Sequence, residues 1–191
     1  MTGHPILQAE RVMLRPFQLS DASEVQRLAG DFAIADTTAN IPHPYPDGAA
    51  EHWIQSYSSR FAEGREVVFA IIIREENLLG GAIGLHQIDT ENERAEMGYW
   101  IGVPFWGRGY CTEAAAAVIT FGFTQLQLQR IFACHFKRNP ASGRAMAKNG
   151  MKWEGCLRQH LKRRGRFEDL DYYGILREEW LAFQNHRPDA G

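Results

Sequence analysis

The chain has little cysteine and no long hydrophobic run. Its 191 residues include three cysteines, Cys111, Cys134 and Cys156, an odd number that argues against a disulfide framework and indicates reduced thiols. No apolar stretch approaches the roughly 18 to 20 residues that span a bilayer, and the N-terminus lacks the hydrophobic region of a signal peptide. The sequence therefore predicts a cytoplasmic location and no membrane partner.

The chain also lacks an excess of one charge and any metal-ligand motif. Lysine and arginine number 21 and aspartate and glutamate 23, for a formal net charge of −2. A nucleic-acid binder carries a strong basic excess, which this chain does not. The seven histidines are scattered, and no Cys or His pair has the spacing of a zinc site. We therefore expect neither a nucleic-acid partner nor a metal.

Hydrophobic periodicity divides the chain into alternating strands and helices within one domain, residues 1–191, whose core covers about 8–182. Strands are expected at 10–17, 67–74, 78–88, 94–102, 130–136, 151–161 and 167–176, and helices near 21–29, 47–61, 112–125 and 140–148. The segment 35–46, with three prolines, is expected to be a loop. The element order is β-α-α-β-β-β-α-β-α-β-β, an α/β (α+β) fold class.

The most informative stretch is the turn of residues 102–114, which joins an apolar strand to an alanine-rich helix. The first turn of a helix has unpaired N–H groups and the positive end of the helix dipole, and both attract anions. Gly107 and Gly109 let backbone amides approach a phosphate, Arg108 adds a charge and Thr112 a hydroxyl. The turn is neither G-x-x-x-x-G-K-[ST] nor G-x-G-x-x-G, so two common phosphate loops are excluded.

Residues 106–111, Trp-Gly-Arg-Gly-Tyr-Cys, resemble the pyrophosphate loop [QR]-x-x-G-x-[GA] of the GCN5-related N-acetyltransferases (GNAT). The central glycine matches, whereas Trp and Cys replace the first and last residues of the pattern. Residues 139–158, 96–101 and 173–180 are similar to segments of the RimJ/RimL-like, ribosomal-protein acetylating branch. The resemblance implies a mixed, mostly antiparallel central sheet flanked by helices, and acetyl transfer from acetyl-CoA to a primary amine by direct attack.

The resemblance also implies where the cofactor binds. The strand that ends near Val103 would separate from the strand 130–136, and the pantetheine arm would lie in the opening. A backbone N–H of Ile101 or Gly102 would then face the thioester oxygen. The expected acetyl-CoA-binding residues are Trp100, Ile101, Gly102, Val103, Trp106, Gly107, Arg108, Gly109, Tyr110, Cys111, Thr112, Asn139 and Ser142.

Two residues are predicted to be catalytic. Glu96 lies on the strand that leads to the cofactor and is the expected general base, with His86 on the adjacent strand as the second candidate. The alternative for Glu96 is an ion pair with Arg94 or Arg130. Ser142, three residues after an expected Asn cap, is the expected proton donor to the leaving thiolate, by resemblance, or else only a capping hydroxyl. No cysteine nucleophile is expected, since Cys111 belongs to the phosphate loop.

Several features leave alternatives open. Arg144 and Lys148 lie one helical turn apart and could reach the 3′-phosphate of the cofactor. His43 and Tyr45 in the proline-rich loop could cover the acceptor pocket. The basic segment 162–166 is either a solvated hairpin tip or a rim for an acidic substrate.

The identity of the amine acceptor is open as well, between a peptide N-terminus and a small molecule. A CoA-binding sensor or scaffold without turnover and a transferase for another acyl group, such as succinyl, are the alternative functions. The pattern does not decide whether the chain forms a homodimer.

Overall fold

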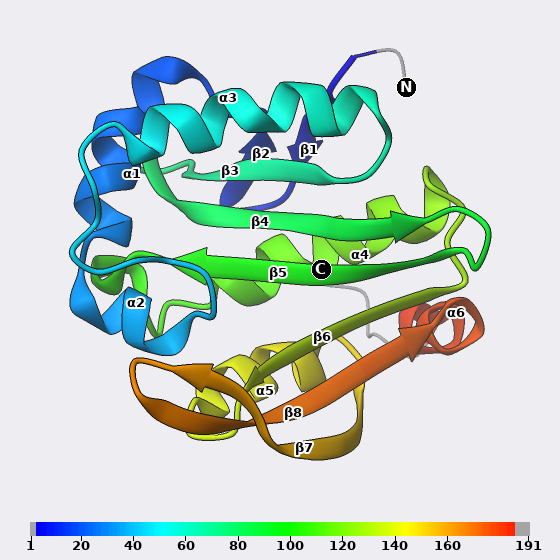
Figure 1. The fold of residues 1–191 in the computed structure, drawn as a ribbon. Coiled ribbons are helices and arrows are strands. Elements are labelled where there is room, and N and C mark those ends of the chain that lie inside the picture. The colour runs from blue at the N-terminus through cyan, green and yellow to red at the C-terminus, as the bar shows by residue number, and fades with distance from the viewer. Residues whose placement is uncertain (1–2, 186–191) are drawn as a thin grey trace.

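A computed structural model describes residues 3–185 as an eight-stranded sheet with helices on both faces (Figure 1). Its strand order is β1-β2-β3-β4-β5-β6-β8-β7, and only β5 and β6 pair in parallel. The strands are β1 (Leu7–Gln8), β2 (Val12–Arg15), β3 (Val67–Ile73), β4 (Leu78–Asp89), β5 (Arg94–Ile101), β6 (Arg130–Phe136), β7 (Lys152–Arg163) and β8 (Arg166–Leu176). The mixed, mostly antiparallel sheet expected from the sequence is confirmed.

The helices α1, α2 and α3 lie on the face of the sheet toward the viewer in Figure 1, and α4 and α5 lie behind it. They are α1 (Ala22–Ala29), α2 (Phe32–Thr37), α3 (Ala49–Ala62), α4 (Tyr110–Thr124), α5 (Pro140–Lys148) and α6 (Arg177–Asn185), with short 3-10 turns at Leu19–Asp21 and Val103–Phe105. None of the helices within residues 3–185 is long and apolar enough to cross a membrane.

The predicted elements occur in the predicted order, but three elements were missed: the two-residue strand β1 and the helices α2 and α6. The loop expected at 35–46 is wrong at its start, because α2 extends to Thr37. An N-cap stabilises this helix, since the Asp31 carboxylate accepts the N–H of Ala33 at 2.8 Å. The helix α6 follows β8 directly, and Glu178 and Glu179 in its first turn complement the helix dipole.

Two residues that precede helices do not cap them with their side chains. The Asp21 carboxylate accepts the N–H of Gln18 at 2.8 Å and pairs with Arg15, so it closes the 3-10 turn and makes no side-chain cap of α1. Asn139 does precede α5, but its side chain forms no cap hydrogen bond there. Gly150 follows the end of α5, with φ at +79° in the left-handed region that favours glycine.

The core lies where both faces of the sheet are covered. Every residue of β3 is buried, which explains its uninterrupted run of Val, Phe, Ala and Ile. Ala114 and Ala115 of α4 are fully buried and let the helix approach the sheet closely. Phe69 packs edge-on against Phe121 of that helix, with ring centroids 5.9 Å apart. This packing fixes the N-terminus of α4 at the end of β5.

The sheet splits between β5 and β6. These strands pair only at Arg94–Glu96 with Arg130–Phe132. Past Glu96 they separate, toward the side on which α1 and α2 lie (Figure 1). The predicted parting of the two strands is confirmed, and it places an opening in the middle of the sheet that connects its two faces.

Candidate active site

The split opens into a cavity of about 1180 Å³. Its wall includes β5, β6, the N-termini of α4 and α5, and the loop that follows α2. Of the predicted site residues, Glu96, Trp100, Ile101, Trp106, Gly107, Gly109, Tyr110, Cys111, Thr112, Asn139 and Ser142 line the cavity. Gly102, Val103 and Arg108 lie outside the lining.

The predicted phosphate loop leads into the N-terminus of α4. Gly107 and Gly109 have φ of +75° and +84°, a conformation that L-residues with a Cβ adopt at a cost. The helix begins at Tyr110, two residues earlier than expected, so its unpaired N–H groups follow the second glycine directly. The Glu113 carboxylate turns away from this end and accepts the backbone N–H of Arg11 at 2.6 Å. The helix terminus therefore stays available to an outside anion.

Cations surround this loop. Arg108 donates to Glu76 at 3.3 Å. Arg11 of the segment before β2 donates to the carbonyl of Arg108 at 3.0 Å, a cation that the sequence pattern missed. Arg144 and Lys148 line the cavity from α5, as the sequence suggested, and form no ion pair with any other residue in the described part of the chain. The region thus carries free positive charge next to a helix N-terminus.

The backbone of β5 presents donors to the opening. In an antiparallel pair, successive residues direct their N–H and C=O groups alternately toward the partner strand and away from it. Gly102 donates its N–H to the carbonyl of Gly80 at 2.8 Å, so Ile101 and Tyr99 direct theirs away from β4. The carbonyl of Ile101 accepts the indole N–H of Trp106 at 2.6 Å. Of the two predicted N–H donors, only that of Ile101 therefore faces the cleft.

Ser142 has a partner that the sequence did not reveal. The Tyr99 hydroxyl lies 2.8 Å from the Ser142 Oγ and donates to the Ser142 carbonyl at 3.1 Å. Burial raises the pKa of Tyr99 above its ordinary value, so the phenol stays protonated at neutral pH. Tyr99 occupies an unremarkable strand position, and only the packing of α5 on this face of the sheet brings the two hydroxyls together.

Glu96 lies on the opposite face, at the point where β5 and β6 part. Its carboxylate accepts from Gln87 Nε2 at 3.1 Å and faces the Cys134 Sγ at 3.7 Å. The ion pair with Arg94 or Arg130, the alternative drawn from the sequence, is wrong. Those two arginines pair instead with other carboxylates, Asp89 and Glu154 respectively.

The cysteines near the cavity are poor nucleophiles. Burial raises the pKa of the Cys111 thiol to about 12. Burial, together with the charge of Glu96, raises that of Cys134 to about 11. Only a small fraction of either thiol is ionised at neutral pH, and the thiolate is the reactive form. In the described chain no group of three or more His, Cys, Asp or Glu side chains could hold a metal ion.

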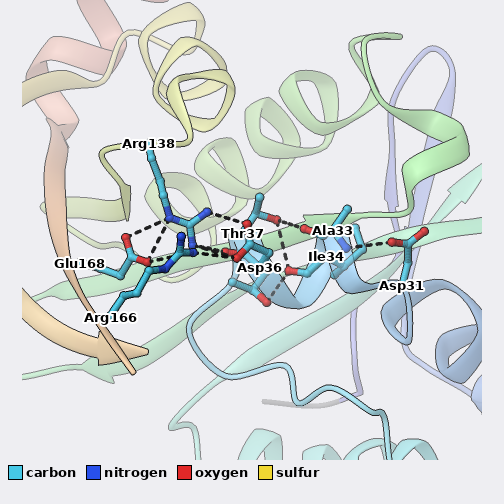
Figure 2. A network of polar contacts seen from close by, with 9 residues as sticks. Asp31, Ala33, Ile34, Asp36, Thr37, Arg138, Arg166 and Glu168 are labelled. Carbon is cyan, nitrogen blue, oxygen red and sulfur yellow. Dashed lines mark hydrogen bonds and ion pairs between the residues drawn. The ribbon is translucent and has the colours of Figure 1, made fainter. Parts of the chain in front are cut away.

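The loop after α2, the α2 loop, lines one side of the cavity. An ion-pair network of Asp36, Arg138, Arg166 and Glu168, the α2 clamp, joins the end of α2 to the segment after β6 and to β8. In Figure 2, Arg138 and Arg166 both point to Asp36 at the end of α2, with Glu168 beside them. Arg138 pairs with Asp36 at 2.7 Å and with the buried Glu168 at 3.0 Å, and Arg166 reaches Asp36 at 3.2 Å.

The basic segment 162–166 lies at the tip of the β7–β8 hairpin, the first of the two alternatives, and Lys162, Arg164, Gly165 and Arg166 are exposed there. Arg163 donates to the carbonyl of Ile41, and the Arg164 guanidinium stacks on Phe32 at 5.1 Å. These side chains therefore hold the α2 loop in place. Only Arg164 and Gly165 form the turn, since β7 and β8 extend to either side of them.

The two loop residues predicted to cover the acceptor pocket behave differently. Tyr45 lines the cavity. His43 contacts α1 and α2 instead, because its Nδ1 bonds to the carbonyl of Gly30 at 3.1 Å and its ring packs edge-on against Phe32.

Comparison with known proteins matches the chain to one family, and the similar proteins carry acetyltransferase names. Residues 11–152 match the model of the acetyltransferase (GNAT) domain. The chain is 34% identical over 177 residues to the uncharacterized N-acetyltransferase p20 of Bacillus licheniformis, covering 92% of this chain and 98% of that protein. It is 31% identical over 107 residues to the ribosomal-protein-serine acetyltransferase of Escherichia coli K12, covering 56% and 59% of the two proteins.

Among solved structures, the fold resembles that of RimL, an alpha-N-protein acetyltransferase in complex with coenzyme A. The TM-score is 0.83 at 19% identity, over 90% of this chain and 98% of that one. At this identity the likeness concerns the fold.

Proposed function

Because the chain belongs to the GNAT family of acetyltransferases, we propose that it transfers an acetyl group from acetyl-CoA to a primary amine in a ternary complex. The observation that carries this proposal is the split between β5 and β6. It joins a face with the N-terminus of α4 and the Ser142–Tyr99 pair to a face with Glu96. A donor and an acceptor can therefore meet in the opening from opposite sides of the sheet.

The residues present fit coenzyme A. The left-handed glycines and the N-terminus of α4 suit the pyrophosphate. Arg144 and Lys148 suit the 3′-phosphate, because they line the cavity without ion-pair partners in the described chain. The pantetheine amides suit the outward-directed backbone groups of Tyr99 and Ile101. The acetyl-CoA would supply a thioester, whose carbonyl carbon is the point of attack.

Each step of the proposed reaction is assigned to a different group. Glu96 removes the proton of the ammonium, directly or through water, so that a neutral amine can attack. The N–H of Ile101 stabilises the oxyanion that develops on the thioester oxygen. Ser142, held by the Tyr99 hydroxyl, donates to the sulfur as the thiolate leaves. No covalent acyl-cysteine is required, which agrees with the raised pKa of Cys111.

The acceptor class rests on relatives. The names of the similar Escherichia coli protein and of RimL support a protein N-terminal amine as the first acceptor to test, and small-molecule amines as the second. The deciding experiment is a screen of peptide N-termini and small amines with acetyl-CoA. It measures release of free CoA and identifies the acetylated product by mass. If the protein binds acetyl-CoA but releases no free CoA with any amine, it is a CoA sensor and not an enzyme. If it is active with succinyl-CoA alone, the transferred group is succinyl and not acetyl.

Coenzyme A at 100 times its dissociation constant should stabilise the protein by about 2.7 kcal/mol, which corresponds to a rise in Tm of roughly 5 to 10 °C for a chain of this size. Gly109→Val should abolish the shift, because valine disfavours the φ of +84° and its side chain would enter the space of the anion. Differential scanning fluorimetry with and without CoA measures both effects.

The matched control is Gly165→Val, which strains a glycine with φ of +77° in the β7–β8 turn, away from the loop. This variant should lose stability and keep the CoA-induced shift. A wild-type Tm that does not move in millimolar CoA would contradict the proposed function.

A further inference from the structure

Three titratable side chains form a row across neighbouring strands on the face that carries Glu96. His86 of β4 is the register partner of Glu96 of β5. On the other side, Val67 pairs with Leu85, so Glu66, one residue before β3, stands opposite His86. Register partners share one face of a sheet, so the three side chains stand side by side. All three line the cavity.

The first member of the row is a buried carboxylate. Glu66 is 8% exposed. It accepts hydrogen bonds from Arg60 of α3 and from Nδ1 of His86, both at 3.1 Å. Burial by itself would raise the pKa of Glu66, but the bonds and charges of His86 and Arg60 outweigh it and lower that pKa below its ordinary value. Glu66 is therefore a carboxylate at neutral pH and can only accept from His86.

This contact determines the tautomer of the imidazole. Because Nδ1 carries the hydrogen that Glu66 accepts, the neutral ring has its lone pair on Nε2. The ring lies against Gly98 of β5, where a Cβ would stand 3.3 Å from Nε2. Nε2 forms no hydrogen bond with the described residues, so it is available as a proton acceptor on the face that carries Glu96.

We propose that Glu66 is a positioning residue, which holds His86 so that its Nε2 receives the proton that Glu96 takes from the acceptor amine. The inference rests on the proposed function. First an N–H bond of the ammonium breaks as an O–H bond forms on Glu96. That O–H bond then breaks as an Nε2–H bond forms, and the imidazolium releases its proton to solvent, to which the side chain is 32% exposed.

The charges around His86 favour this relay. The titratable groups around it are Glu66 and Glu96 in the row, with Arg60 and Tyr57 of α3 beside Glu66. Two carboxylates, those of Glu66 and Glu96, stand on either side of His86 in the row. An imidazole is also a better match than a carboxylate for accepting protons near neutral pH. A carboxylate behind a metal-ligating imidazole typically contributes about 10- to 100-fold, and an effect of that size is expected here.

Glu66→Gln tests the inference. It should lower kcat/KM about 10-fold or more at pH 7 and leave the CoA-induced thermal shift unchanged. Glutamine places no negative charge beside the imidazole, so the rising limb of kcat/KM against pH should move toward acid. Glu66→Asp keeps the charge and should restore the limb toward its wild-type position. Glu24→Gln, which breaks an exposed pair with Arg27, is the matched control and should behave as wild type.

A merely structural role would lower stability without moving the limb, and that outcome would overturn the proposal, as would wild-type kinetics in Glu66→Gln. A second measurement does not depend on turnover. Imidazole ¹⁵N spectra of the wild type, assigned with His86→Gln, should show the Nδ1–H tautomer of His86, and Glu66→Gln should lose that preference. An Nε2–H tautomer in the wild type overturns the positioning by Glu66. The expected tautomer in a protein that acetylates no amine would leave the positioning intact and refute the proposed function.

Discussion

Ser142→Ala is expected to lower kcat about 10- to 10⁴-fold, the range spanning partial replacement of a general acid by water. The thiolate would leave without a hydrogen-bond donor, while the N-terminus of α4 and its loop stay intact. The CoA-induced rise in Tm should therefore change little. Steady-state release of CoA, with the acceptor that the screen identifies, measures the effect.

Tyr99→Phe provides the companion test, because it removes the hydroxyl 2.8 Å from Ser142 Oγ and keeps the ring. If the two hydroxyls act as a unit, the double variant should be no slower than Ser142→Ala alone. Additive losses would mean that Tyr99 acts elsewhere. Normal turnover in Ser142→Ala would mean that the serine has only a structural role in the first turn of α5. Another group would then donate the proton.

Glu96→Gln is expected to lower kcat/KM at pH 7 by about 10²- to 10⁴-fold, the usual contribution of a general base. Glutamine keeps the shape of the side chain but cannot accept the proton of the ammonium. At higher pH more of the amine is neutral without help, so part of the lost rate should return. The pH profile of CoA release, compared between variant and wild type, measures both effects.

The thermal shift with CoA is the control, and it should be the same in Glu96→Gln and wild type, since the carboxylate lies on the face away from the phosphate loop. If kcat/KM of Glu96→Gln equals that of the wild type at every pH, Glu96 is not the general base. The proton would then pass from the amine to His86 without an intermediate carrier.

The strand–turn–helix geometry of the proposed phosphate loop could be predicted from the sequence because its determinants are local. A strand, two glycines and a helix within about a dozen residues dictate their mutual geometry. The split next to it was expected only by resemblance, and the register of β5 with β6 confirms it. Local signals also indicated most strands, because their apolar runs end at recognisable turns.

The contacts that position the candidate catalytic groups could not be predicted in this way. Tyr99 and Ser142 are 43 positions apart, and Glu66 and His86 are 20 apart. Each pair depends on which residue of one strand opposes which residue or helix turn of another, and a shift of one residue would turn the side chain to the other face. The α2 clamp joins Asp36 to residues 102 and 130 positions away, so no local pattern signals it.

The split also creates two internal sheet edges. Edge strands present unpaired N–H and C=O groups, which other chains can join, and proteins usually protect them with charges, prolines or cover. Here the unpaired parts of β5 and β6 face each other across the cavity. The helices on both faces of the sheet and the α2 loop cover them. A ligand with amide groups, such as a pantetheine arm, would take the place of a missing strand and complete the sheet. Binding of such a ligand would then also satisfy the unpaired backbone groups of these internal sheet edges.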